Sequence, residues 1–581
     1  MVYTKGVSDY ISSVNQVFDE ISLKEFVPLG PIYGTMDCHS ACENLIRMRM
    51  SNYWVNPANA AIDPAKRRES SVANVLAFDK AGFLFEPWTL SQEQRSALHC
   101  VQKILADAVK GFRFDPTLLR MPSGESNISA RGDVSVYAKL RDVSQWCVTA
   151  DAFDLACTVV YNCPGLKRAA RHHIGVLSDE ERSRLYFAFS DYSDVGYRVF
   201  RECFLQMVTI VDGSRIETVP KDNDVDRVIS CEPFLNMIVQ SVIEEGIRAI
   251  IRTKFGYDLD TLADDHKALV VDTSFATIDL KNASNSNWLS VIDYLYPERF
   301  RRFLHASRSP SGTFKGQSHD WTMVSPMGNG FTFGLMTLTL LALGKSITSD
   351  VSVFGDDILI KQPHAGSMID LCKLCGFEVN EKKTFISGAF RETCGGFSSH
   401  GQRITSFKFN RATDVVTANV LVNKVYILMK MNPLIYWLRL LWRRLLKLVP
   451  AFYLEFRDIS SPEGRFVVVN NDNLLLRLRR ACALYKKFRT TWLNRREVKL
   501  FARQNRYAID QLSPVCYATH STIPYKWKRA PVHNVKGILI SFYLFNGRVS
   551  VPTVRSSSAR VSYEVVASSR WTANSPTLAD G

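Results

Sequence analysis

The stretch that decides the fold is Val-Ser-Val-Phe-Gly-Asp-Asp-Ile-Leu-Ile at positions 351–360, where two adjacent carboxylates follow a glycine between two apolar runs. The runs Val351–Phe354 and Ile358–Ile360 predict the two strands of a hairpin, with the glycine in its turn. Asp356 and Asp357 would repel each other at the tip of such a hairpin unless a cation neutralised them. Carboxylate oxygens are the hard ligands that Mg²⁺ prefers. The decapeptide therefore predicts either a divalent-metal site or an ordinary exposed Gly-Asp-Asp turn.

A third acid, Asp279, ends another strand-like run, Phe275–Leu280, and lies 77 residues before Asp356. A sheet can place an acid at the end of one strand beside the tip of a hairpin that is distant in sequence. Three carboxylates brought together in this way can bridge two Mg²⁺ ions, one activating an attacking hydroxyl and one bracing a leaving phosphate. The alternative is that Asp279 caps a helix, because small polar residues follow it.

Two further segments carry groups suited to a nucleotide. Lys221 and Arg227 lie in a charged stretch upstream of the acids. Arg227 can grip phosphate oxygens with two N–H groups, whereas Lys221 acts as a point charge; the alternative is a solvated loop. The glycine-rich segment Ser325–Gly334 runs into the apolar helical segment Leu335–Leu343. Such a backbone lets a phosphate or sugar approach closely, and the N-terminus of a helix favours anions.

Residues 375–385, after the Gly-Asp-Asp segment, end a helical run and begin an extended one. They contain Lys382 and Lys383, and a lysine near bound metal ions could protonate a leaving pyrophosphate. The next segment, Phe390–Phe397, has the pattern of a tight hairpin. The segments therefore follow one another in a defined order: a basic loop, a strand that ends on an acid, a glycine-rich segment, an acidic hairpin and a segment with two lysines.

The composition is that of a globular protein: 581 residues, 46% hydrophobic and 22% charged. Lys and Arg number 72 against 57 Asp and Glu, and the net charge of +15 suits a polyanionic partner. The 13 cysteines are scattered, which argues against a disulfide framework and favours a reducing compartment. Cys372 and Cys375 have CxxC spacing without a second pair, so they are interpreted as core thiols rather than zinc ligands. No signal pattern and no uninterrupted membrane-spanning run occur, so no membrane partner is expected.

The order of helical and β-branched runs predicts an α+β protein. Residues 1–215 are expected to form an N-terminal region, and residues 216–410 a mixed core whose catalytic part is about 265–397. Residues 411–553 are expected to be helical and basic, and residues 554–581 to form a flexible tail.

Individual runs make this prediction specific. Helices are predicted at Ser91–Val109, Asp179–Phe189, Val195–Val211, Phe234–Phe255, Phe331–Leu343 and Ser367–Leu374. Leu434–Leu454 predicts an amphipathic helix whose leucines pack inward and whose basic residues face solvent or nucleic acid; the alternative is a helix that lies on a membrane.

Taken in order, these segments resemble a known family. The matching stretches are TVPK…DR…EP…NM (218–237), ATIDL..AS (276–284), S.MGNGFTFGL (325–335), FGDDI (354–358), GF..N.KKTF.SG.FRETCG (376–395) and a polar strand (404–410). They resemble the replicase beta subunit of the leviviruses, the small single-stranded RNA bacteriophages, over about residues 216–410. The resemblance implies a right-hand polymerase with fingers, a palm built on an antiparallel sheet flanked by helices, and a helical thumb. It implies RNA-directed RNA polymerase activity by two-Mg²⁺ nucleotidyl transfer.

The resemblance also implies catalytic roles. Asp279, Asp356 and Asp357 map onto the acids that bind two Mg²⁺ ions, with Mn²⁺ as a substitute ion. Lys383 maps onto the proton donor, and Lys382 is the alternative.

Other residues map onto nucleotide contacts. Lys221 and Arg227 correspond to basic residues that contact the incoming nucleotide. Gly328 and Asn329 lie in the segment that positions template and sugar, and Asn329 is the candidate for sensing the sugar or base pair. Asn285 stands where the family usually has Asp, at the position that helps to sense the ribose 2′-hydroxyl.

Partners follow from the same resemblance: RNA template and product, ribonucleoside triphosphates, and host elongation factors Tu and Ts with a ribosomal protein, in the cytoplasm of an infected bacterium. The basic residues of 415–510 would grip the product duplex, and the aromatic residues of Tyr485–Trp492 could stack bases. Two other functions stay open, a reverse transcriptase and a decayed polymerase that only binds RNA. A Phe-Gly-Asp-Asp hairpin without a bulky residue before the acids opposes the first, and retention of all three acids opposes the second.

Overall fold

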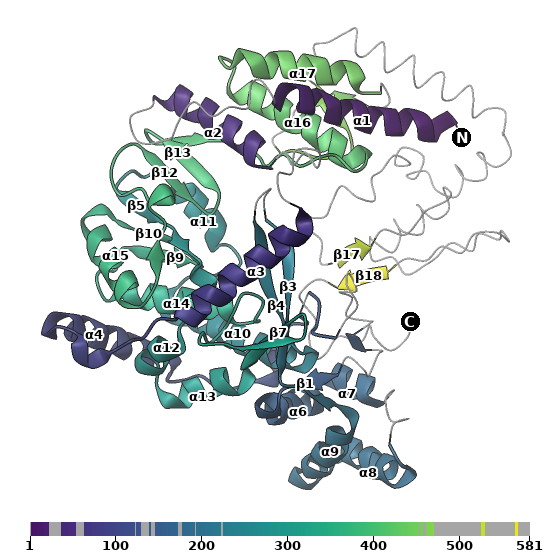
Figure 1. The fold of residues 1–581 in the computed structure, drawn as a ribbon, viewed down its shortest axis with the longest axis vertical. Helices are drawn as coiled ribbons and strands as arrows, with labels where there is room; N and C mark the ends of the chain where they lie inside the picture. The colour runs from purple at the N-terminus through teal and green to yellow at the C-terminus, as the bar shows by residue number, and fades with distance from the viewer. Residues whose placement is uncertain are drawn as a thin grey trace. The chain divides into compact units, whose positions relative to one another are not determined.

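The computed structural model describes residues 2–22, 37–53, 63–122, 124–128, 139–140, 146–171, 177–191, 193–221, 225–450, 453–456, 461–469, 525–528 and 564–567 (Figure 1). Helices and sheets are mixed along the chain. The chain divides into two compact units, one of residues 1–61 with 404–565 and one of residues 62–403 with 566–581. Each unit buries its own set of apolar side chains.

The first unit is mainly helical in its described part. Its elements are α1 (Val2–Ser22), α2 (Cys38–Tyr53), α16 (Val415–Met431), α17 (Tyr436–Leu448) and the parallel strands β15 (Leu454–Phe456) and β16 (Val467–Val469). Helix α1 packs against α16 and α17, as Figure 1 shows. Polar contacts fix this packing: Tyr10 Oη donates to Asn419 Oδ1 at 2.9 Å, and Arg411 makes a two-pronged ion pair with Asp19. A further short pair consists of β17 (Tyr525–Lys528) and β18 (Glu564–Ala567), and the division at 565/566 falls inside β18.

Helix α17 separates apolar from basic side chains. Leu438 and Leu441 are buried, whereas Arg439 and Arg443 are exposed. The amphipathic helix predicted from the sequence is therefore confirmed, although it begins two residues later and ends six residues earlier.

The second unit is built around a three-stranded antiparallel sheet in the order β5–β10–β9. Its strands are β5 (Phe275–Ile278), β10 (Asp357–Lys361) and β9 (Val351–Phe354). Ile358 in β10 pairs with Val353 on one side and with Ile278 on the other. All three side chains are fully buried, so hydrophobic burial fixes the register. The predicted hairpin is confirmed.

The remaining strands of this unit form other sheets. They are β4 (Asp226–Cys231), β3 (Gly213–Pro220), β7 (Ser311–Phe314) and β8 (Gln317–Asp320) in one sheet; β12 (Phe390–Thr393), β13 (Gly396–Ser399) and β14 (Gln402–Ile404) in another; and the pairs β6 (Leu280–Lys281) with β11 (Glu378–Val379) and β1 (Cys147–Val148) with β2 (Thr209–Ile210).

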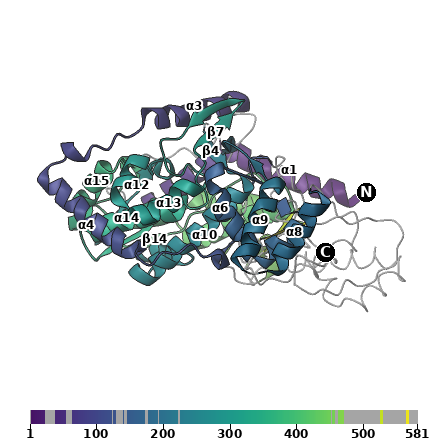
Figure 2. The ribbon, with the colours of Figure 1, turned by 90° about the horizontal axis from the view of Figure 1, so that it is seen from below.

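Helices surround these sheets. They are α3 (Pro64–Ala81), α4 (Gln92–Val109), α6 (Phe153–Asn162), α7 (Pro164–Arg171), α8 (Asp179–Ser190), α9 (Asp194–Met207), α10 (Phe234–Ile250), α11 (Leu262–Leu269), α12 (Leu289–Leu295), α13 (Glu298–Ser307), α14 (Thr332–Lys345) and α15 (Ala365–Leu374). Figure 2 shows α15, α14, α13, α10, α6, α9 and α8 following one another across the unit.

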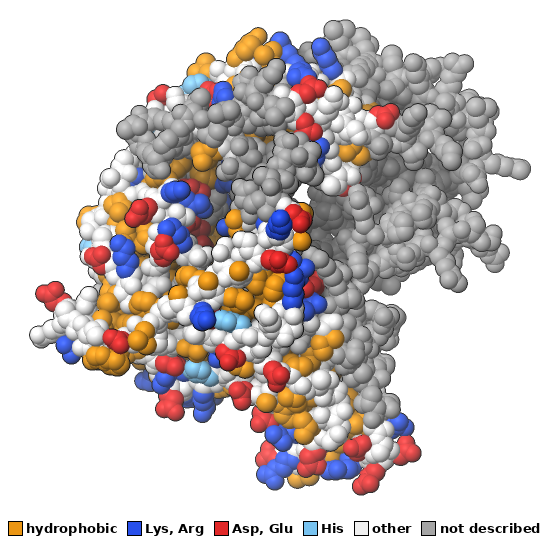
Figure 3. Space-filling model, in the orientation of Figure 1, with side chains coloured by type: hydrophobic (Ala, Val, Ile, Leu, Met, Phe, Trp, Pro, Cys, Tyr) orange, Lys and Arg blue, Asp and Glu red, His pale blue; other side chains and the backbone are white. Residues whose placement is uncertain are grey.

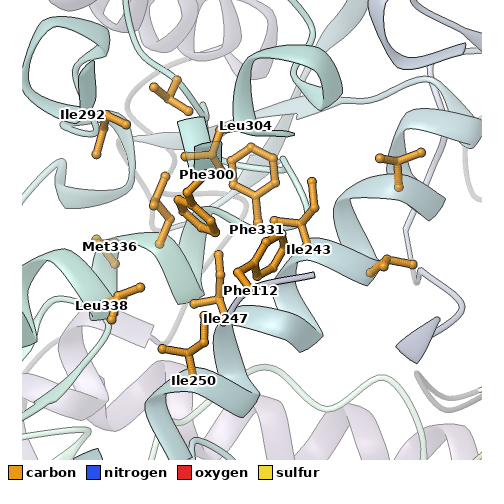
Figure 4. Close-up of a cluster of buried hydrophobic side chains, with 14 of the residues drawn as sticks. Phe112, Ile243, Ile247, Ile250, Ile292, Phe300, Leu304, Phe331, Met336 and Leu338 are labelled. Atoms are coloured by element: carbon orange, nitrogen blue, oxygen red, sulfur yellow. The ribbon is translucent and has the colours of Figure 1, made fainter. Parts of the chain in front are cut away.

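The core of the second unit joins α10 to α13 and to the start of α14. Figure 4 shows Ile243 and Ile247 of α10 beside Phe331, with Phe300 and Leu304 of α13 on the other side. All five side chains are buried to 1% exposure or less. Each contributes about 1.5–3 kcal/mol by leaving water. The glycine-rich segment that precedes α14 is therefore mounted on a rigid helical core.

Most predicted elements are confirmed, and three more besides α17 differ in extent. The helix Phe234–Phe255 is confirmed, but its last turn, 251–255, is a π turn that ends at Gly256. The predicted helix Val195–Val211 stops at Met207, because the next residues pair with β1 as a strand. The predicted polar strand 404–410 is wrong beyond Ile404, where the chain leaves the sheet and enters the other unit.

The units differ from the predicted regions. The expected boundary at 215/216 falls inside β3, whose pairing with β4 keeps both sides in one unit. The observed boundary at 403/404 lies seven residues before the expected one at 410/411. The basic segment 470–510 with Tyr485–Trp492, and nearly all of the expected tail, lie outside the described residues, so their predicted roles stay predictions.

Candidate active site

The register of the central sheet brings the three predicted acids to one end. Ile358 of β10 pairs with Ile278 of β5, so the next position along sets Asp357 opposite Asp279. Asp356 lies in the turn immediately before Asp357. The chain continues from Asp279 into strand β6, so the helix-cap alternative is wrong.

The turn that carries Asp356 is supported by α14. Gly355 has a φ of +63°, a conformation that glycine adopts readily. Its N–H donates to Thr337 Oγ1 at 3.0 Å. A Cβ at this position would lie 2.7 Å from the Phe333 ring, which packs edge-on against Phe354 with centroids 4.9 Å apart. Backbone and space both require glycine before the acids.

The acids are only partly neutralised by the protein. Burial raises the pKa of Asp357 to about 7, and repulsion from Asp356 and Asp279 adds to the rise. The backbone N–H and thiol of Cys394 donate to Asp357 and offset part of this shift. Asp356 is exposed to solvent, yet the protein around it desolvates the carboxylate and, with Asp279, raises its pKa. A cation is the natural complement of such a cluster.

Asp279 is held by two side chains from the segment after β11. Asn380 Nδ2 donates to Asp279 Oδ1 at 2.8 Å, and Lys383 Nζ donates to Asp279 Oδ2 at 3.3 Å. Burial lowers the pKa of Lys383, but nearby carboxylates, Asp279 first, outweigh burial and raise it above the ordinary value. Of the two candidate lysines, Lys383 rather than Lys382 is the one that contacts Asp279.

The donor chemistry at this end of the sheet fits a divalent cation. Three carboxylates supply hard oxygens, and their mutual repulsion and desolvation favour a bound cation. Within the described part of the chain, however, no three His, Cys, Asp or Glu side chains gather closely enough to hold one ion. Asn380 and Lys383 already engage the two oxygens of Asp279. Metal binding by these acids stays a prediction.

Arg227 and Lys221 lie on the β3–β4 hairpin. Arg227 is an exposed residue of β4 that pairs with Val219, and its charge offsets part of the rise in the pKa of Asp356. Lys221 follows β3 with an exposed side chain, and its N–H donates to the Val225 carbonyl at 3.2 Å. The solvated-loop alternative is therefore wrong for Arg227, which is fixed in a strand near the acids.

The start of the glycine-rich segment packs against β4. The Met327 N–H donates to Asn285 Oδ1 at 3.1 Å, and the Met327 carbonyl accepts from the Ser230 N–H at 2.7 Å. Gly328 has a φ of +112°, and a Cβ there would lie 2.2 Å from the Ser230 carbonyl oxygen. Gly328 thus allows a close approach to a strand, and the buried Asn285 uses its carbonyl oxygen to hold the segment.

The expected anion site at the start of α14 is occupied by the protein itself. The Gly330 N–H donates to Gln240 Oε1 at 2.9 Å, and the Gly334 N–H donates to Glu244 Oε2 at 3.1 Å. Both acceptors come from α10. The expectation that these amide groups receive a phosphate is wrong, because a carboxylate and an amide of the same unit already satisfy them.

Asn329 has one buried polar atom without a partner among the described residues. Its side chain is 6% exposed, and its Oδ1 accepts from the Phe331 N–H at 3.1 Å. Its Nδ2 is buried and has no hydrogen-bond partner among the described residues. A buried donor without an acceptor costs about 1–3 kcal/mol. A contact between Asn329 and a substrate stays a prediction.

Sequence reasoning missed several residues that shape the site. Asn380 and Cys394 were part of the family-like stretch 376–395 but received no role, although their contacts to the acids are direct. Arg391 is fully buried and donates to the carbonyls of Phe275 at 2.5 Å and Thr273 at 2.9 Å, which anchors the start of β5. Their place inside the matched stretch was the only available signal, because strand pattern and charge do not reveal such contacts.

Other predictions concern residues outside the site. Cys372 and Cys375 are buried free thiols, and burial raises the pKa of Cys375 to about 12, so the core-thiol interpretation is confirmed. On the face in Figure 3, basic and acidic side chains of the described residues are interspersed. None of the helices in the described ranges has the length and apolar character needed to cross a bilayer.

Comparison with known proteins gives consistent matches. The chain is 30% identical over 274 residues to the RNA-directed RNA polymerase beta chain of Escherichia phage MS2, covering 43% of this chain and 48% of that relative. It is 37% identical over 204 residues to the RNA-directed RNA polymerase subunit beta of Qbeta virus (strain MX1), covering 33% of this chain and 34% of that relative. The chain thus spans half or less of the length of these curated relatives.

A solved structure, the RNA-dependent RNA polymerase of a human picorbirnavirus, is similar over 42% of this chain and 58% of its own, with a TM-score of 0.32 and 14% identity. That similarity is too low to carry an argument. A family model described as RNA replicase, beta-chain, matches residues 83–522, which is well over half of the chain. The chain therefore belongs to the RNA replicase beta-chain family.

Proposed function

We propose that this protein is an RNA-directed RNA polymerase that copies a single-stranded RNA template into RNA. One observation carries the proposal: the β5–β10 register sets Asp279 opposite Asp357, next to the turn that holds Asp356. Relatives that are named RNA-directed RNA polymerases support the same function.

Asp279, Asp356 and Asp357 would hold the Mg²⁺ ions. When bound, Mg²⁺ would polarise the attacking 3′-hydroxyl and neutralise charge on the leaving phosphate. The hairpin and the end of β5 present the three carboxylates from one end of the central sheet.

The basic residues would bind and protonate the triphosphate. Arg227 is held on β4 and would contact phosphate oxygens through its guanidinium, and Lys221 would add a point charge. Lys383 keeps its proton because nearby carboxylates raise its pKa, and its Nζ would deliver that proton to the leaving pyrophosphate. Catalysis would then rest mainly on positioning and charge neutralisation.

The same proposal extends to architecture and partners. The β5–β10–β9 sheet with its flanking helices would be the palm of a right-hand polymerase, with fingers from the preceding residues and a thumb from the basic segment after residue 411. RNA and ribonucleoside triphosphates would be its substrates. Host elongation factors Tu and Ts and a ribosomal protein would be its partners in the cytoplasm of a bacterium.

The test is nucleotide incorporation on an RNA template with Mg²⁺, in an extract of the host. Wild type should incorporate labelled ribonucleotides, and Asp356→Asn should lose this activity while RNA binding stays within about twofold. Asp350→Asn is the matched control, because Asp350 is an exposed acid beyond the opposite end of β9. An inert wild type that still binds RNA would favour the binding-only alternative, and equal use of deoxyribonucleotides would favour a reverse transcriptase.

A further inference from the structure

Helix α10 is joined to the glycine-rich segment by two hydrogen bonds of the same kind. Gln240 Oε1 accepts from the Gly330 N–H at 2.9 Å, and Glu244 Oε2 accepts from the Gly334 N–H at 3.1 Å. Each pair spans 90 residues of sequence. The acceptors are one helical turn apart on α10, and the two glycines have the same spacing.

The glycines leave room for these acceptors. A Cβ at position 330 would lie 2.9 Å from Gln240 Cβ, and a Cβ at position 334 would lie 2.2 Å from Glu244 Oε2. Neither glycine has a left-handed backbone conformation, so lack of space rather than backbone strain explains both. The approach of the two segments therefore depends on these side chains.

Gln240 is fixed by the residues behind it. Its side chain is fully buried, and its Nε2 donates to Glu232 Oε2 at 3.0 Å and to the Ser307 carbonyl at 2.9 Å. Ser309 Oγ donates to the same Glu232 oxygen at 2.6 Å. With both of its N–H groups engaged, the Gln240 amide has one orientation, in which Oε1 faces Gly330.

Glu244 is fixed in a comparable way. Its second oxygen, Oε1, accepts from Arg248 Nε at 2.8 Å, one turn further along α10. Its other oxygen is then directed at the Gly334 N–H in the first turn of α14, where a negative charge is favourable.

We propose that Gln240 and Glu244 are positioning residues that fix the backbone around Asn329 and thereby set the affinity for the incoming ribonucleotide. This inference rests on the proposed polymerase function. Asn329 directly precedes Gly330, and Met327 on its other side is held by Asn285 and β4. The buried, unpartnered Nδ2 of Asn329 thus belongs to a residue whose backbone is tied on both sides.

The first test compares two buried amides of α10. Gln240→Leu should raise the KM for ribonucleotides about tenfold while kcat changes less, because one hydrogen bond to the segment is lost. Asn236→Leu is the matched control: Asn236 is equally buried, but its amide binds Thr149 and the Ser307 carbonyl instead of the segment. It should lower thermal stability comparably and leave KM within about twofold. Equal KM values for both variants would overturn the inference.

The second test covers the case in which Gln240→Leu does not fold. Glu244→Met removes the acceptor and should raise KM about tenfold, whereas Glu244→Gln keeps a carbonyl oxygen and should stay within about threefold of wild type. Similar KM values for the two Glu244 variants would contradict the role. Wild-type incorporation is measured first in every series, so an inert wild type would refute the proposed function, whereas active variants with an unchanged KM would refute only this inference.

Discussion

Polar side chains have different surroundings at the acid end of the central sheet and at the junction between α10 and α14. At the sheet, desolvation and then repulsion between carboxylates raise the pKa values of Asp356 and Asp357, with few donors to offset the rise. At the junction, Gln240 and Glu244 are buried, and both ends of each head group have hydrogen-bond partners. The contrast teaches that this unit can satisfy buried polar groups where structure needs them, and leaves charge unbalanced where a ligand is expected.

Helix α14 connects the two regions. Its first turn receives Glu244 at Gly334, and its next turn supports the acidic hairpin through Thr337 and Gly355. Substitutions of the acids should therefore lower activity without lowering stability, whereas substitutions at the junction should lower stability.

The largest effect is expected from Asp357→Asn. Loss of a carboxylate should lower ribonucleotide incorporation by about 10³-fold or more, because it removes charge stabilisation in the transition state. The melting temperature should stay unchanged or rise, because a desolvated and repelled charge disappears. Incorporation assays and thermal unfolding on the same preparation would measure both. A clear fall in melting temperature would mean that the acids are already satisfied, and would remove the contrast between the regions.

Gly334→Ala should give the largest loss of stability. The new methyl group would collide with Glu244, and such overpacking costs about 1–3 kcal/mol. Adding Glu244→Ala should recover part of the loss, with a coupling of about 1 kcal/mol in a double-mutant cycle. Gly366→Ala in α15 is the control, because open space surrounds that position, and it should be neutral or slightly stabilising. Additive effects of Gly334→Ala and Glu244→Ala would show that the two positions are not in contact.

Glu232→Gln should change how stability depends on pH. Burial raises the pKa of Glu232 from 4.5 to about 7, so the folded protein keeps a proton that the unfolded chain has released. The free energy of unfolding of wild type should therefore fall as the pH rises from about 4.5 to 7, by about 1–3 kcal/mol. Glu232→Gln lacks this pH-dependent loss of stability. The melting temperature of the variant should therefore exceed that of wild type by more at pH 8 than at pH 5. A constant difference across this range would show that Glu232 stays ionised when folded.

The smallest effect is expected from Cys394→Asn. Cys394 and Gly395 form a two-residue hairpin turn with φ values of +50° and +72°, a conformation that Asn adopts more easily than Cys. The backbone N–H that reaches Asp357 remains. Thermal unfolding should show a gain of about 0.5 kcal/mol, and incorporation should stay within about twofold. A larger loss of activity would show that the contact between the Cys394 thiol and Asp357 contributes to activity.

Sequence pattern predicted the acid end better than the junction. Short apolar, β-branched runs located β9, β10 and β5, and the order of the motifs indicated that Asp279 belongs with Asp356. The same reasoning assigned the amide groups at the start of α14 to a phosphate, because the glycines were visible and their partners were not. Gln240 lies 90 residues from Gly330 inside an apolar helix, and no local pattern marks a contact of that range. The choice between Lys382 and Lys383 also depended on side-chain direction, which spacing alone does not give.

The matched spacing of the α10–α14 contacts has a consequence for how this segment can change. Adding or deleting one residue between 330 and 334 would rotate the second amide by about 100° around the helix axis. Glu244 and the backbone N–H at position 334 would then both lose their hydrogen-bond partner, whatever the remaining side chains are. Residues 330–334 can thus accept new residue types at several positions but tolerate no change in their number. Natural variation here should therefore consist of replacements and never of insertions or deletions.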